Sequence, residues 1–302
     1  MAEPLETDSS LLVVILDVNA SAWARSPLSL DKALQQMVIF INAYLALNPE
    51  NRLVVLATNH SDCRYLFPSD PASVPPEHDI RVYEQFRVVD IKVLSGAQSM
   101  LAAQVNGGAE EQQSLISRAL SMALCHINRV SESSLGKIWS RILVLSAGQD
   151  SPRSYVSLMN SIFAAQKMNV LIDICKVFGP NSVFLQQAAD ITGGNYLKVD
   201  TNSEASLLQT LMFTCLPDQY TRGILNAPGN DIIDFRATCF CHKRVVDIGY
   251  VCSVCLSIFC KMAPVCSTCQ TKFSFRLGRS DSSQSNGKPS PSTAAMSTLA
   301  IK

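Results

Sequence analysis

Apolar and polar residues alternate in blocks along the first two thirds of the chain. Short apolar runs predict buried strands, and the first of them is rich in β-branched residues. These runs cover residues 11–16, 53–57, 63–67, 138–145, 170–176 and 196–199. Each of these runs is short enough for a strand and too short for an ordinary helix.

Between these runs, apolar residues recur at helical spacing. The first such segment carries Leu34, Met37, Val38, Ile41 and Leu45, follows the candidate caps Ser29 and Asp31, and ends at Asn48-Pro49. Further helices are expected over residues 114–130, 154–168, 183–191 and 203–215, and a partly helical segment over 80–94. Alternating strands and helices predict an open, doubly wound, mostly parallel α/β sheet.

The pattern changes after Leu216-Pro217-Asp218. We expect an α/β domain over 10–218, a linker over 219–236 and a cysteine-rich module over 237–278. The first nine residues and the serine-rich segment 279–302 have little that could pack in a core, so disorder is expected at both ends.

Composition narrows the class of protein. Of 302 residues, 47% are hydrophobic, and 25 Lys and Arg balance 25 Asp and Glu. A net charge near zero gives no general attraction to nucleic acid or to anionic membranes. The acidic first ten residues do not resemble a signal peptide, and no apolar run approaches the length of a membrane span. We expect a soluble intracellular protein.

The cysteine-rich module carries the strongest chemical signal. Cys252-Ser-Val-Cys255 and Cys266-Ser-Thr-Cys269 are two C-x-x-C knuckles. Each knuckle turns two thiolates toward one point, and two knuckles complete a tetrahedron around Zn²⁺. Disulfides are the alternative, but they suit secreted chains. Four thiolates without an open position predict a structural zinc site.

A second group of metal-ligating residues surrounds the knuckles: Cys239, Cys241, His242 and Cys260. Taken as consecutive pairs, the cysteines suggest an interleaved arrangement in which the first and third pairs share one metal. The third pair has only Cys260, and His242 could supply the missing ligand. The sequence thus predicts one zinc and leaves a second open.

Catalytic motifs are absent from the sequence. Neither nucleotide fingerprint, G-x-G-x-x-G or GxxxxGK[ST], occurs, and neither does G-x-S-x-G or H-E-x-x-H. We therefore expect no catalytic residue and no small-molecule substrate.

The loop after the first strand, Asp17-Val18-Asn19-Ala20-Ser21, is similar to the D-x-S-x-S loop of von Willebrand factor A domains. That resemblance implies Mg²⁺ held by Asp17, Asn19 and Ser21, with Ser114 and Asp150 contributed by later loops. Asn19 replaces a hydroxyl residue, however, and Ser146-Ala147-Gly148 stands where the family has T-D-G. We expect the site to be empty and its polar side chains to hydrogen-bond the backbone instead.

A wider resemblance covers nearly the whole chain. The segments YVCSVCLSIFC, CFCH and CSTC of the module resemble the finger of the smaller von Willebrand A-like subunit of the transcription and repair factor TFIIH. The N-terminal domain agrees in these segments: LLVVILDVN, RILVLS, NSIFAAQKMNVLIDIC, DITGGNYLKV and Leu216-Pro217-Asp218.

This resemblance implies a nuclear, non-enzymatic scaffold subunit of the TFIIH core, acting in RNA polymerase II transcription initiation and nucleotide excision repair. Its partners would be other core subunits, chiefly the larger one with a von Willebrand A domain and a RING-like finger, and it would meet DNA only through the complex. Two alternatives stay open. One is a RING-like ubiquitin ligase, and the other is a nucleic-acid-binding zinc protein whose scattered Lys and Arg accompany Phe273 and Phe275.

Overall fold

The computed structural model separates into two compact units, Met1–Ile233 and Asp234–Lys302, called here the sheet unit and the finger unit. The structure describes residues 9–68, 82–104, 115–133, 138–149, 154–199, 206–225, 233, 235–242, 244–255, 257–273 and 296–300. Among these residues, no helix is both long enough and apolar enough to cross a membrane.

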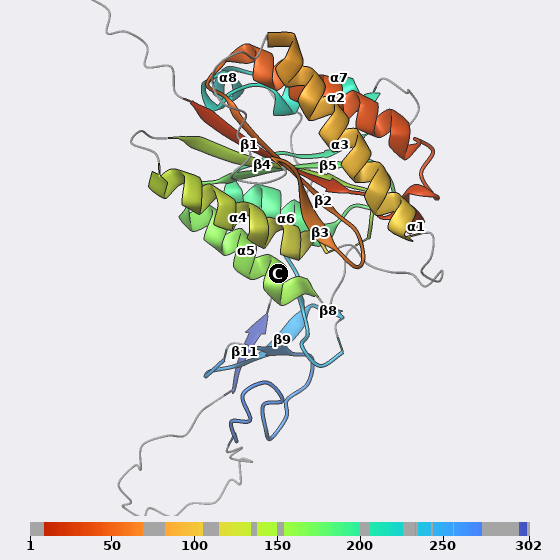
Figure 1. Cartoon of the computed structure of the whole chain (residues 1–302). Helices are drawn as coiled ribbons and strands as arrows, with labels where there is room; N and C mark the ends of the chain where they lie inside the picture. Colours follow the sequence, from red (N-terminus) through yellow and green to blue (C-terminus); the bar gives the residue numbers. More distant parts are fainter. Residues whose placement is uncertain are drawn as a thin grey trace, which may run out of the picture. The chain divides into compact units, whose positions relative to one another are not determined.

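The sheet unit is built on one six-stranded sheet (Figure 1). Its strands are β1 (Ser10–Asp17), β2 (Arg52–Thr58), β3 (Cys63–Phe67), β4 (Trp139–Ser146), β5 (Leu171–Lys176) and β6 (Tyr196–Lys198). They lie in the order β3-β2-β1-β4-β5-β6, and only β3 runs antiparallel to its neighbour. The doubly wound, mostly parallel sheet expected from the sequence is confirmed.

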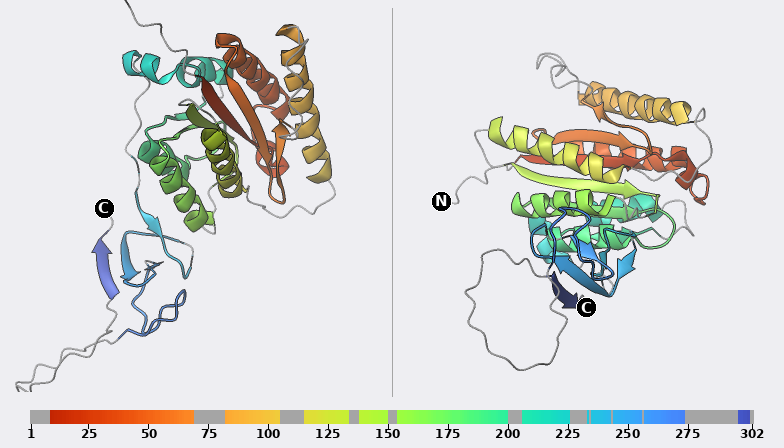
Figure 2. Two further views of the ribbon diagram at one scale, coloured as in Figure 1. Left: turned by 60° about the vertical axis from the view of Figure 1, so that its left-hand side comes forward. Right: turned by 90° about the horizontal axis from the view of Figure 1, so that it is seen from below.

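Helices cover both faces of this sheet (Figure 2). One face carries α1 (Ala20–Trp23), α2 (Leu30–Leu47), α3 (Val82–Gln104), α7 (Ser206–Thr210) and the π-helical turn η2 (Leu211–Cys215). The other face carries α4 (Ile116–Ser133), α5 (Tyr155–Lys167) and α6 (Val183–Thr192). Because side chains alternate along β1, Leu12 and Val14 enter the first core, whereas Leu11 and Val13 enter the second.

Helix α3 is longer than the partly helical segment expected over 80–94. The sequence underestimates it because Gly96 interrupts the apolar pattern. A Cβ atom at Gly96 would lie 2.7 Å from Cδ2 of Leu66 on β3. The glycine therefore lets the helix approach the edge strand closely, and tertiary packing outweighs its low helix propensity.

The expected linker also contains structure. Residues Gln219–Ile224 form helix α8, whose start is capped by Asp218, because the carboxylate accepts a 2.9 Å hydrogen bond from the backbone N–H of Thr221. The linker prediction over 219–236 was wrong for this segment. Gly223 lowers the helix propensity of a six-residue segment, so its helix depends on contacts with the sheet unit that the sequence does not reveal.

The finger unit holds short strands. β7 (Ala237–Thr238) pairs with β8 (Val245–Val246), and β9 (Ile248–Cys252) pairs with β10 (Ile258–Phe259) on one side. Among the described residues of this unit, Cys252, Phe259, Cys266 and Phe273 pack together in one buried cluster. Two of the four core side chains are candidate metal ligands.

The other side of β9 is paired with β11 (Met296–Ala300), which runs antiparallel over five residues. Disorder was expected over 279–302, and for these five residues that expectation was wrong. Composition identified the serine-rich segment, but it does not show that an unpaired edge of β9 can accept one more strand. The remainder of the tail and residues 1–8 lie outside the described residues.

Candidate metal centres

The four-cysteine cluster consists of Cys252, Cys255, Cys266 and Cys269. Its Sγ atoms lie 3.7 Å apart for the pair Cys252 and Cys269, and 3.6 Å apart for the pair Cys255 and Cys266. A tetrahedral zinc ion with Zn–S bonds of about 2.3 Å separates its sulfur ligands by about 3.8 Å. The cluster therefore has the spacing of a tetrahedral thiolate site.

The backbone holds both knuckles in place. Cys252 at the end of β9 donates its N–H to the carbonyl of Ser257 at 3.0 Å, and Cys266 donates to that of Thr271 at 2.9 Å. The second knuckle closes through Gln270, which adopts a left-handed φ of 59° and donates its N–H to the carbonyl of Cys266 at 2.9 Å. Each tight turn directs two thiols inward.

Hydrogen bonds favour thiolates at the outer ligands. The Thr271 hydroxyl lies 3.0 Å from Sγ of Cys269, and its hydrogen bond lowers the pKa of that thiol to about 6. For Cys255, burial opposes the ionised form, but hydrogen bonds from Ser257 lower the pKa overall. Burial raises the pKa of Cys252 to about 11. A positive ion at the centre would satisfy all four sulfurs.

A second group, the CCHC cluster, consists of Cys239, Cys241, His242 and Cys260. Sγ atoms of Cys241 and Cys260 are 3.5 Å apart, and Nδ1 of His242 lies 3.2 Å from each of them. All four ligand atoms lie within 4.8 Å of one another. Mixed thiolate and imidazole donors are typical of structural zinc sites.

Along the chain, the two clusters interleave, because Cys260 of the CCHC cluster follows Cys255 and precedes Cys266 of the other. The structure thus brings together the residues that the sequence groups, including His242 beside Cys260. Both clusters could hold a metal ion. A backbone hydrogen bond of 2.7 Å from Phe240 to Ile258 connects the two arms of the CCHC cluster.

The Asp17 loop of the sheet unit has a different role. Asp17 is 1% exposed, and its Oδ1 accepts the N–H of Asn19 at 3.2 Å. Its Oδ2 accepts the N–H groups of Ala147 at 3.3 Å and Gly148 at 2.9 Å. Asn19 caps α1, accepting from the N–H and the hydroxyl of Ser21. The carboxylate of Asp17 and the amide oxygen of Asn19 thus accept hydrogen bonds from backbone N–H groups.

Ser114 and Asp150, the other two positions considered for magnesium, lie outside the described residues. The described part of the loop does not fit the ion. Mg²⁺ requires oxygen ligands in a near-octahedral shell, whereas three N–H groups already point at the Asp17 carboxylate.

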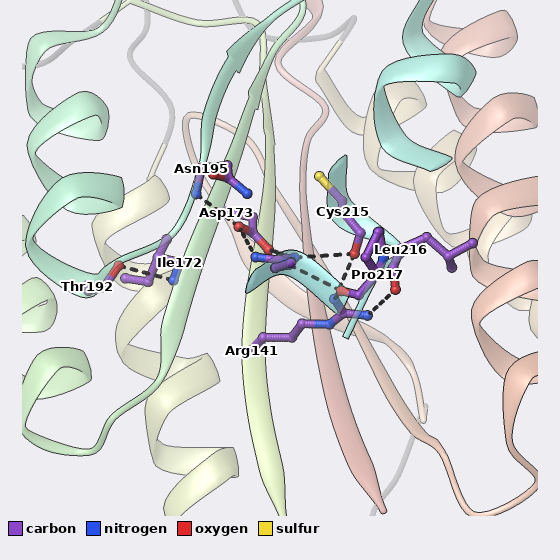
Figure 3. Close-up of polar contacts among 9 residues, drawn as sticks. Arg141, Ile172, Asp173, Thr192, Asn195, Cys215, Leu216 and Pro217 are labelled. Atoms are coloured by element: carbon purple, nitrogen blue, oxygen red, sulfur yellow. Dashed lines mark hydrogen bonds and ion pairs between the residues drawn. The ribbon is translucent and has the colours of Figure 1, made fainter. Parts of the chain in front are cut away.

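Sequence reasoning missed a part-buried group of polar contacts around Arg141 and Asp173 (Figure 3). Arg141 donates to the carbonyl oxygens of Cys215, Leu216 and Pro217 at 2.7, 3.2 and 2.9 Å. Arg222 of α8 binds both carboxylate oxygens of Asp173, at 2.8 and 2.6 Å.

One signal could have revealed this group. Asp173 stands in the middle of the apolar strand β5, and a carboxylate buried to 1% exposure requires a cationic or hydrogen-bonding partner. Asn195 donates its N–H to the same carboxylate at 3.0 Å. Together these contacts fasten the last helix of the sheet unit to its sheet.

The strand order, the helices on both faces and the two interleaved clusters define a doubly wound α/β protein with a C-terminal finger that could hold metal ions. A crystal structure of the TFIIH p34 N-terminal domain is similar to the sheet unit, with a TM-score of 0.58 and 29% identity, and the match covers 68% of this chain and 97% of that chain. The model of the family described as transcription factor Tfb4 matches residues 9–270, and the chain belongs to this family.

Relatives of full length support this assignment. The chain is 44% identical over 280 residues to general transcription and DNA repair factor IIH subunit tfb4 of Schizosaccharomyces pombe, covering 90% of this chain and 92% of the relative. It is 37% identical over 294 residues to subunit TFB4 of the same factor in Arabidopsis thaliana, covering 95% and 96%. Similarity therefore extends through the sheet unit and both cysteine clusters.

Proposed function

We propose that this chain is a subunit of general transcription and DNA repair factor IIH and acts by protein–protein contacts, without catalysing a reaction. The observation that carries the proposal is the similarity over almost the full length of relatives that bear this name. Its place of action would be the nucleus, and its contact with DNA would be indirect, through the complex.

Both units offer surfaces suited to such contacts. On the sheet unit, Phe213, Tyr220 and Ile224 expose 79%, 78% and 67% of their surface, all within η2 and α8. On the finger unit, Ile248 and Val254 are 57% and 59% exposed. Groups of exposed large apolar side chains favour protein interfaces. We propose other subunits of the factor as the partners, chiefly the larger one with a von Willebrand A domain and a RING-like finger.

Zinc is the proposed cofactor, with one ion in each cluster. Sulfur spacings near those of a tetrahedral site and the N and S donors favour zinc over magnesium or calcium. Each ion would be coordinated by four protein ligands, with no position left for a substrate. Its role would be to hold the shape of the finger.

Affinity purification from cells tests the proposal. We expect a tagged full-length chain to recover the subunits of factor IIH in equal amounts at moderate salt. Cys266→Ser should reduce this recovery because a ligand of the four-cysteine cluster is lost, whereas Cys125→Ser, which changes an exposed thiol on α4, should not. Recovery of the unchanged chain as a free monomer would contradict the assignment.

The interleaved clusters favour one alternative, a RING-like ubiquitin ligase. Such a protein would use the finger to bind a ubiquitin-conjugating enzyme. The pure chain, loaded with zinc, should then form ubiquitin conjugates with at least one member of a panel of conjugating enzymes. If no enzyme of the panel forms ubiquitin conjugates, in an assay where a known ligase is active, this alternative is excluded.

A further inference from the structure

Three polar residues form a row across the sheet where β1, β4 and β5 end. The strand register aligns Leu16 with Leu145, and Ser146 with Lys176, so Asp17, Ser146 and Lys176 follow one another across three neighbouring strands. Residues aligned in parallel strands direct their side chains to the same face. Asp17 is 1% exposed, and Ser146 and Lys176 are fully buried.

Gly148 connects the two charged members of this row. Its backbone N–H donates to Oδ2 of Asp17 at 2.9 Å, and its carbonyl oxygen accepts a hydrogen bond from Nζ of Lys176. The ammonium group thus reaches the loop that also binds the Asp17 carboxylate. Lys176 lies two strands from Asp17, Ser146 is between them in the register, and both charged side chains bind Gly148.

This geometry disagrees with the magnesium site that a von Willebrand A-like fold implies. A divalent cation at Asp17 would need free carboxylate lone pairs and further oxygen ligands. The carboxylate instead accepts three backbone N–H groups, and Ala147 stands where the related loops carry an acidic residue. The buried ammonium of Lys176, which binds the carbonyl oxygen of Gly148, would also repel a divalent ion.

We propose that the Lys176 ammonium takes the place of a metal ion at the ends of β1, β4 and β5, where Asp17, Ser146 and Lys176 lie. This region is called here the Asp17 corner. The ammonium compensates the buried Asp17 carboxylate, and through the carbonyl of Gly148 it fixes the loop after β4. The loops at this end of the sheet therefore keep one conformation without any ion. Partners that bind this end should do so independently of divalent cations.

A double-mutant cycle on the full chain with zinc present tests the charge coupling. Lys176→Met keeps the apolar stem and leaves the Asp17 carboxylate without its cation, so the thermal midpoint should fall by roughly 10 °C. Asp17→Asn added to that variant should cost less than half of what it costs alone. Lys198→Met is the matched control, because Lys198 is exposed and aligns with Lys176 on β6.

Manganese provides the second readout. The unchanged chain should show no shift of its thermal midpoint in Mn²⁺, whereas Lys176→Ala should recover part of its loss because the ion replaces the ammonium. The variant with both Lys176→Ala and Asp17→Asn should not respond. Three results would each overturn the proposal. The losses in the cycle could be additive, the unchanged chain could respond to Mn²⁺ in a way that Asp17→Asn abolishes, or the Lys176→Ala chain could fail to respond to Mn²⁺.

Discussion

The sheet unit and the finger unit stabilise themselves by different means. In the sheet unit, two apolar cores on either face of one sheet bury several dozen side chains, among them Phe40, Ile41 and Ile162. In the described part of the finger unit, the core cluster holds two phenylalanines and two cysteines. Burial of apolar surface can maintain the first unit, but so small a core cannot offset the conformational entropy of ordering the second.

The polar sites differ in the same way. At the Asp17 corner, backbone N–H groups and Lys176 satisfy the carboxylate from within the chain. In the clusters, three pairs of sulfur atoms lie 3.5 to 3.7 Å apart, and we expect a cation from outside the chain to compensate their thiolates. We therefore expect the first unit to fold without an ion and the second to need one.

Removing metal should produce the largest difference in stability between the two units. Structural zinc contributes on the order of 10 kcal/mol to the folding of a small module. With a strong chelator, we expect hydrogen exchange to become fast throughout the finger unit and to stay unchanged in β1, β4 and β5. Native mass spectrometry should show two zinc ions before chelation and none after. Protection of the finger that survives complete loss of zinc would break the comparison.

Single ligand substitutions should show that each cluster holds its own ion. Cys266→Ser removes a ligand that is 1% exposed, and Cys241→Ser removes an exposed one. Each should leave one zinc in the native mass spectrum, and loss of a site of this kind costs about 5 kcal/mol. Cys125→Ser should retain both ions. Two zincs in either ligand variant would show that the affected cluster is not a metal site.

In the sheet unit, Arg222 and Asp173 form an internal ion pair. Arg222→Ala leaves the Asp173 carboxylate buried without its guanidinium, and breaking such a pair costs about 3 kcal/mol. The thermal midpoint of the sheet unit should fall by roughly 6–12 °C, with faster exchange in α8. Arg129→Ala, on the exposed side of α4, should change neither quantity. An unchanged midpoint for Arg222→Ala would mean that α8 is held by apolar contacts alone.

The sequence allowed the strands, the main helices and both ligand groups to be predicted, because each rests on a local pattern. Apolar runs identify β1 and β5, and C-x-x-C spacing identifies the four-cysteine cluster. Features that depend on distant contacts were missed. Helix α8 is fastened by Arg222 to Asp173, 49 positions away along the chain, and β11 depends on the edge of β9. In the sequence, Lys176 is only the last residue of a strand. Its alignment with Asp17 becomes visible only from the strand register.

Deletion of strand β11 tests whether the stability of the finger unit depends on strand pairing as well as on metal. Deleting residues 294–302 removes the strand that pairs with Ile248–Cys252. We expect faster hydrogen exchange of the β9 amides and a loss of about 1 kcal/mol, because net hydrogen-bond contributions are small. Both zinc ions should remain. Deleting only residues 301–302 should preserve the protection of β9. Release of a zinc ion from the longer deletion would make β11 part of the metal site's support.

The smallest expected change in stability is that of Ser146→Ala. It tests whether the Asp17 corner contains the Lys176 ammonium alone or also a bound ion. The Oγ atom of Ser146 is buried and has no hydrogen-bond partner among the residues that the structure describes. In a corner closed by Lys176, the hydroxyl contributes nothing, so Ser146→Ala should leave the thermal midpoint unchanged or raise it, with a gain of about 1 kcal/mol at most. Ser161→Ala is the matched control, because the Ser161 hydroxyl donates to the carbonyl of Ser157 at 3.0 Å and should lower stability when removed. A loss for Ser146→Ala larger than that for Ser161→Ala would show that the hydroxyl has a partner in solution, such as a bound ion, and the sheet unit would then share the finger's dependence on metal.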